Sequence, residues 1–60
     1  MKYSEFHRLI EKNGWRFFHA KGSHYFYVKD DVLSPPVPYH GTQEIGEGLR
    51  RKLIKLMELK

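Results

Sequence analysis

A chain of 60 residues with a net charge of +4 and no cysteine can form one small domain spanning residues 1–60, without disulfides or a thiolate zinc site. Because no disulfide or zinc site can add stability, the core must come from the aromatic side chains, which make up 15% of the residues, or from a partner chain. A core this thin leaves little room for a buried substrate pocket, so any activity should lie on an open surface and act on something large. The 11 Lys and Arg against 7 acidic residues suit a nucleic acid or an acidic protein as partner. No signal peptide, membrane-length apolar run or lipidation motif is found, so we expect a cytoplasmic protein without a membrane partner.

The first element is predicted to be a short amphipathic helix over roughly residues 4–13. Ser4 suits the N-cap position, and Gly14 is well placed to end the helix in a left-handed conformation. Residues at helical spacing form its apolar face: Tyr3, Phe6, Leu9, Ile10 and Asn13. His7 falls off this face, so we expect it to be solvated.

Two strands follow, over residues 15–20 and 24–29, joined by a tight turn at Lys21-Gly22-Ser23. In the second strand, Phe26 and Val28 alternate with Tyr25 and Tyr27, and aromatic residues stand at both parities. Two arrangements are therefore open. Either Phe26 and Val28 face the core and the tyrosines form an exposed strip with Lys29, or the tyrosines pack inward.

The rest of the chain predicts a third strand and a second helix. Asp30-Asp31 marks a turn, and the prolines at positions 35, 36 and 38 restrict the third strand to an edge or to an irregular extended run. From Leu49 onward an apolar arc indicates a helix, with these members: Leu49, Leu53, Ile54, Leu56, Met57 and the stem of Lys60. The order helix, three strands, helix predicts an α+β fold with both helices on one face of a three-stranded antiparallel sheet.

His24 is the main candidate for chemistry, because a tight turn and an aromatic strand hold its imidazole in a fixed position near solvent, where it can contact a substrate. From the spacing alone, a partly exposed strand histidine with no chemical role is the other interpretation. His19 flanks the same turn from the other strand; it could act as a second acid or base, or pack at the rim of the core. No histidine pair has metal-ligand spacing, and we expect no metal site and no cofactor.

The chain resembles the HicA family of bacterial toxins along nearly its whole length. The resemblance lies in the following motifs: Gly22-Ser23-His24 in a hairpin, Val37-Pro38-Tyr39-His40-Gly41, Glu44-Ile45, the basic stretch Gly48–Lys55, and in the first helix Ser4-Glu5-Phe6, Leu9 and Asn13-Gly14. Two departures are Pro35-Pro36, which stiffens the third strand and leaves its register open, and a first strand more aromatic than is usual in the family.

This resemblance implies a fold similar to the double-stranded RNA-binding domain, and an mRNA interferase that a HicB antitoxin binds and silences. It implies that His24 is the catalytic residue, and RNA offers a suitable substrate because its 2′-hydroxyl is an internal nucleophile. We expect the turn residue Gly22 to position the site, and these side chains to contact RNA: Arg16, Lys21, Ser23, Tyr25, Tyr27, Lys29, Arg50, Arg51 and Lys55. His40 matches the Pro-x-His position of the family, which implies a structural or RNA-facing role rather than a catalytic one. The alternatives are a non-catalytic RNA-binding module and a protein-interaction domain.

Overall fold

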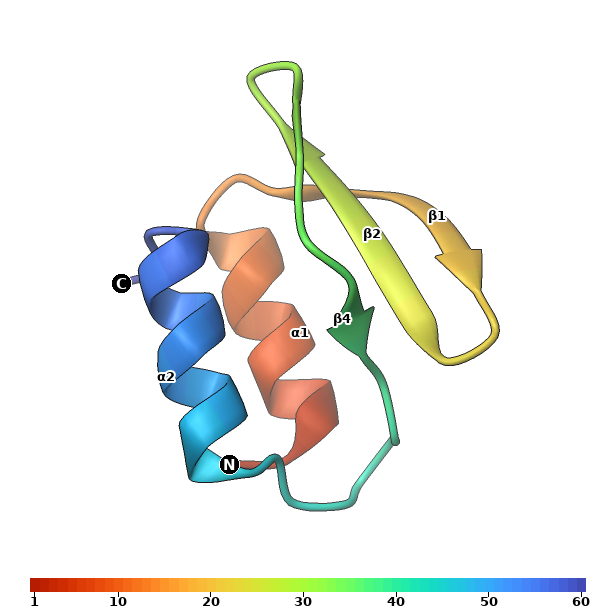
Figure 1. The fold of residues 1–60 in the computed structure, drawn as a ribbon, viewed down its shortest axis with the longest axis vertical. Coiled ribbons are helices and arrows are strands. Elements are labelled where there is room, and N and C mark those ends of the chain that lie inside the picture. The colour runs from red at the N-terminus through yellow and green to blue at the C-terminus, as the bar shows by residue number, and fades with distance from the viewer.

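The computed structural model describes all 60 residues, and two helices pack on the same face of a small antiparallel sheet (Figure 1). In chain order the elements are α1 (Tyr3–Lys12), β1 (Arg16–Lys21), β2 (His24–Lys29), β3 (Val32–Leu33), β4 (Val37–Pro38) and α2 (Glu47–Leu56). The predicted α+β class and the order of helix, strands and helix are confirmed. Neither helix is long and apolar enough to cross a membrane.

Strand β2 is the centre of the sheet, and the predicted third strand is divided into two short pieces along one of its edges. β1 pairs with β2 on one side, while β3 and β4 both pair with β2 on the other. Between them, Ser34 exchanges two hydrogen bonds with Tyr27: its amide donates to the carbonyl of Tyr27 at 2.8 Å, and its hydroxyl accepts from the amide of Tyr27 at 3.0 Å. Pro35 and Pro36 then interrupt the ladder because they have no N–H to donate. Both predicted alternatives therefore occur: the segment is an edge strand at Val32–Leu33 and Val37–Pro38, and an irregular extended run at Pro35-Pro36 between them.

The tyrosines of β2 face the helices, so the arrangement with an exposed tyrosine strip is wrong. Tyr27 is 3% exposed and belongs to the core, and Tyr25 is half-buried against it. Phe26 and Val28 consequently point to the other face of the sheet. The physical reason is that Tyr27 brings its hydroxyl to a buried hydrogen-bond partner on α1, so the larger ring can be buried without an unsatisfied polar atom.

Helix α1 begins one residue before the expected position, and its N-cap is Lys2 rather than Ser4. The first helical amides are satisfied by distant carbonyls instead: Tyr3 donates to Gln43 at 2.9 Å and Ser4 donates to Gly41 at 3.0 Å. A side-chain cap at Ser4 is unnecessary because the connection to α2 passes under the end of the helix. At the other end Gly14 is left-handed, with φ of 91°, as predicted.

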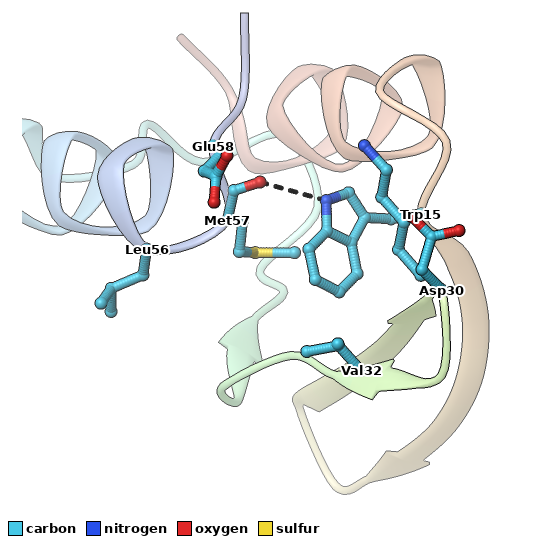
Figure 2. Close-up of a pocket in the computed structure, with 7 residues that line it drawn as sticks. Trp15, Asp30, Val32, Leu56, Met57 and Glu58 are labelled. Carbon is cyan, nitrogen blue, oxygen red and sulfur yellow. Dashed lines mark hydrogen bonds between the residues drawn. The ribbon is translucent and has the colours of Figure 1, made fainter.

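The chain end turns back after α2 and adds a core residue that helical periodicity did not identify. Glu58 is left-handed, with φ of 52°, and the amide of Leu59 donates to the carbonyl of Ile54 at 2.9 Å, which is the Schellman arrangement. Leu59 is thereby buried, whereas Leu56, predicted to lie on the apolar arc, is 56% exposed. Met57 also receives a hydrogen bond, since the indole N–H of Trp15 donates to its carbonyl at 3.2 Å (Figure 2).

Candidate active site

The β1–β2 hairpin presents His24 at the first position of β2, directly across from Lys21. Gly22 has φ of 60° and Ser23 has a negative φ, which is the pattern of a type II′ turn with glycine at its first central position. On the other side, His24 pairs with Pro38 of β4, and the carbonyl of Ser23 accepts a hydrogen bond from the amide of Tyr39 at 2.8 Å. The backbone of His24 is therefore fixed between two strands, while its side chain is exposed.

The side chains that share a face with His24 define what we call the outer face of the sheet, opposite the helices. Its members follow from the register: Arg16, His19 and Lys21 from β1, and His24, Phe26 and Val28 from β2. Two cations and two histidines thus lie on one surface that the helices leave uncovered. This surface can attract a phosphate backbone and present an imidazole to it.

A β-bulge places His19 on the outer face. Arg16 and Phe17 pair with Val28 and Tyr27, but the next pair is His19 with Phe26, so Phe18 has no partner. Strict alternation would have put His19 beside Phe17, whose ring packs against Tyr25 on the helix side. Neither a rim-of-core role nor burial is therefore available to His19, which is exposed.

The other expected RNA-contacting residues divide between the outer face, the turn and the helix side. Lys21 lies opposite His24, Ser23 is exposed in the turn, and Arg16 lies on the outer face at the far end of β1. Tyr27 is wrong as an RNA contact because its ring is in the core, and only part of Tyr25 reaches the surface.

The remaining predicted cations are not brought to His24. Lys29 points to the helix side, where its stem runs over Gly14. Helix α2 packs on that same side through Leu53 and Met57. Its cations, of which Arg50 is half-buried, therefore do not share the outer face: Arg50, Arg51 and Lys55. The Arg51 guanidinium donates to the carboxylate of Glu47 at 2.7 Å, and Arg50 lies 3.8 Å from the same carboxylate.

His7 is the important residue that sequence reasoning misplaced, since it is 5% exposed rather than solvated. Its Nδ1 lies 2.6 Å from the hydroxyl of Tyr27, and its Nε2 lies 2.8 Å from the carbonyl of Pro38. A neutral ring satisfies both partners if Nε2–H donates to Pro38 and Nδ1 accepts from Tyr27. The signal was present in the spacing Tyr3, His7, Ile10, which is i, i+4, i+7 on a helix.

Burial controls the protonation of this pair. It lowers the pKa of His7 below its usual value, although the hydrogen bond to Pro38 opposes the shift. Burial likewise raises the pKa of Tyr27 to about 12. Both groups are therefore neutral at physiological pH. Because His7 holds the carbonyl of Pro38, and Pro38 pairs with His24, this hydrogen bond fixes the edge strand beside the candidate site.

None of the surface pockets is lined by His24. One of about 250 Å³ lies between the β2–β3 turn and the end of α2, lined by Trp15, Val32 and Leu56 among others (Figure 2). Another of about 340 Å³ lies over Tyr25, between α1 and the sheet. No group of three or more His, Cys, Asp or Glu side chains is placed to hold a metal ion. His24 thus lies on an open surface, which suits contact with a macromolecule better than binding of a small molecule.

Comparison with known proteins gives one family and one close relative. The family model described as "HicA toxin of bacterial toxin-antitoxin" matches residues 3–59. A protein of Pseudomonas fluorescens (strain Pf0-1) named "Probable mRNA interferase HicA" is 47% identical over 60 residues, which cover 100% of this chain and 98% of that protein. No solved structure gives a significant match.

Proposed function

Because this chain belongs to the HicA toxin family, we propose that it is the toxin of a bacterial toxin–antitoxin system and an endoribonuclease that cleaves mRNA through His24. The observation that carries the proposal is the position of that imidazole. It is exposed on the outer face, between Lys21 and the edge strand β4, on a backbone that both neighbours hold.

The chemistry requires little apparatus, since RNA carries its nucleophile next to every phosphodiester. His24 removes the proton of the 2′-hydroxyl, and the resulting oxygen attacks the adjacent phosphorus. The bond from phosphorus to the 5′-oxygen breaks, and that oxygen leaves and takes up a proton. A neutral imidazole nitrogen can accept this proton, and histidine is the side chain that most often serves as a general base. The products are a 2′,3′-cyclic phosphate and a 5′-hydroxyl, and the scheme requires no metal ion.

Lys21 and the turn stabilise the charge that develops on the phosphate. Lys21 lies directly across from His24, so its ammonium can reach a phosphate oxygen while the imidazole faces the ribose. Gly22 has nothing within 4 Å of the position that a Cβ would take, so the backbone of the turn is open to a phosphate. Arg16, at the far end of the outer face, attracts the strand without reading its sequence.

The outer face is also the surface through which we propose that the toxin is silenced: the HicB antitoxin covers it and so blocks His24. The face is basic, and Phe26 and Val28 are half-buried at its centre, which fits an acidic partner with an apolar centre. An excess of antitoxin should then remove both RNA cleavage and RNA binding.

The test compares wild type with His24→Ala on end-labelled RNA, in the presence and absence of EDTA. We expect wild type to cleave equally well with EDTA and to leave cyclic phosphate ends, and His24→Ala to bind RNA without cleaving it. His40→Ala is the matched control, because His40 is also exposed but packs edge-on to Tyr3 on α1. Induced expression in bacteria should arrest growth and fragment transcripts only when His24 is present.

Three results would contradict the proposal. Cleavage by His24→Ala at the wild-type rate would remove His24 from the chemistry, and 3′-hydroxyl products would exclude attack by the 2′-oxygen. Salt-sensitive binding of RNA by wild type without cleavage would leave a non-catalytic RNA-binding module. Absence of RNA binding would leave a protein-interaction domain.

A further inference from the structure

We propose that His19 is a second catalytic residue, the general acid that protonates the leaving 5′-oxygen while His24 acts as base. This inference rests on the function proposed above and goes beyond it, because a single imidazole leaves the departing oxygen without a proton donor. The geometry of three features supports it: the bulge in β1, the stacking of His19 on Phe26, and the spacing of the two histidines on the outer face.

The bulge at Phe18 is what brings His19 to the reaction side. It inserts one residue between the pairs Phe17–Tyr27 and His19–Phe26, and so reverses the facing of every β1 side chain from His19 to the hairpin. Lys21 is turned to the outer face by the same irregularity. The bulge therefore positions both a cation and a second imidazole around His24, at the cost of an exposed Phe18.

His19 is held in place yet available. Its ring stacks on Phe26 with a centroid separation of 5.5 Å and an angle of 25° between the planes. This contact limits the ring's orientation without using its nitrogens. Among the four histidines, only His7 has both ring nitrogens hydrogen-bonded to the protein. The ring nitrogens of His19 are thus free to hydrogen-bond a substrate, whereas those of His7 are occupied by Tyr27 and Pro38.

The spacing suits a phosphate between the two rings. His24 lies opposite Lys21, and His19 lies opposite Phe26, so His19 and His24 are diagonal neighbours across the β1–β2 pair. Diagonal neighbours are about 7–8 Å apart, with their Cβ atoms somewhat closer. A phosphate group with a hydrogen bond of about 2.8 Å on each side fills a gap of this order. Lys21 neighbours both histidines, opposite His24 and two residues along β1 from His19, and shares the outer face with them.

The proton balance follows from this arrangement. The 2′-oxygen gives its proton to neutral His24 and forms a bond to phosphorus. The bond from phosphorus to the 5′-oxygen breaks on the opposite side, and that oxygen takes a proton from the imidazolium of His19. The products are the 2′,3′-cyclic phosphate and the 5′-hydroxyl. His24 is left protonated and His19 neutral, and exchange with water restores both.

The decisive experiment varies the leaving group. Two matched RNA oligonucleotides carry either the ordinary linkage or a single linkage in which sulfur replaces the 5′-bridging oxygen, because a thiolate departs without protonation. We expect His19→Gln to lower cleavage of the ordinary linkage by about a hundredfold, the scale of a general acid. Cleavage of the sulfur linkage should remain within a few-fold of wild type. His24→Gln should slow both linkages, and His40→Gln neither.

A pH profile gives an independent readout. A general acid must be protonated, so wild-type activity should fall at high pH, and His19→Gln should lose that decline. If His19→Gln slows both linkages equally, or neither, His19 is not the acid, whatever the role of His24. If His24→Gln cleaves like wild type, the proposed function itself fails. Equal thermal melting of His19→Gln and wild type shows that the variant is folded, and the ratio of the two linkages remains decisive if it melts earlier.

Discussion

The buried pair formed by His7 and Tyr27 should contribute a large share of the stability of so small a domain. The change Tyr27→Phe removes only the hydroxyl, which lies 2.6 Å from Nδ1 of His7, and leaves a buried ring nitrogen without a partner. Such a loss costs about 1–3 kcal/mol. For 60 residues, at about 0.05–0.15 kcal/mol each, the total free energy of unfolding is about 3–9 kcal/mol. The midpoint of thermal unfolding should fall by about 4–8 °C for each kcal/mol lost.

Urea unfolding of the purified chain measures this effect, with all variants made on a His24→Ala background so that expression is tolerated. Tyr39→Phe is the matched control, because Tyr39 stacks on Tyr25 at 5.0 Å but no hydrogen bond of its hydroxyl is found in the structure. We expect that control to change the free energy of unfolding by less than about 0.5 kcal/mol. Equal effects of the two substitutions would show that the hydrogen bond between His7 and Tyr27 makes no net contribution to the free energy of unfolding.

Three further predictions concern pH and the left-handed positions of the chain. The pKa of His7 is lowered in the folded state, so the unfolded state binds more protons below about pH 6.5. The contribution of His7 to the free energy of unfolding should therefore be fully present above that pH and should decrease as the pH drops below it. Urea titrations repeated between about pH 8 and about pH 5 measure this change. A flat profile would show that His7 is not buried as a neutral ring. Asp30 and Asp31 both have positive φ, 51° and 64°, as a type I′ turn requires, so Asp31→Gly should raise stability by about 1 kcal/mol, measured by the same unfolding assay. Glu58→Gly should stabilise the chain by a similar amount, about 1 kcal/mol, because Glu58 is left-handed at the end of α2; a lower melting temperature would contradict the Schellman geometry there.

Much of the fold follows from local patterns that need no partner. The apolar spacing of the two helices, the turn at Gly22-Ser23 and the turn at Asp30-Asp31 predict the element order, since each depends on residues adjacent in the chain. The prolines at positions 35 and 36 predict an edge strand or an irregular extended run for the same reason, and they lie in the irregular run between β3 and β4. His24 is also found at the mouth of the hairpin, where the sequence indicates it, and the role assigned to it stays a prediction.

What the tertiary structure alone decides is which face each side chain occupies. Both faces of β2 carry aromatic side chains, so hydrophobicity does not distinguish Tyr27 from Phe26. Which of the two faces the helices depends on His7, 20 residues away, whose Nδ1 accepts a hydrogen bond from the hydroxyl of Tyr27. The facing of His19 depends in turn on the bulge at Phe18, which a pattern of alternating residues does not reveal. Local sequence determines backbone conformation through short-range sterics and spacing. The face of the sheet that a side chain occupies depends on the residues that pack against it, and these come from distant segments of the chain that meet only in the folded structure.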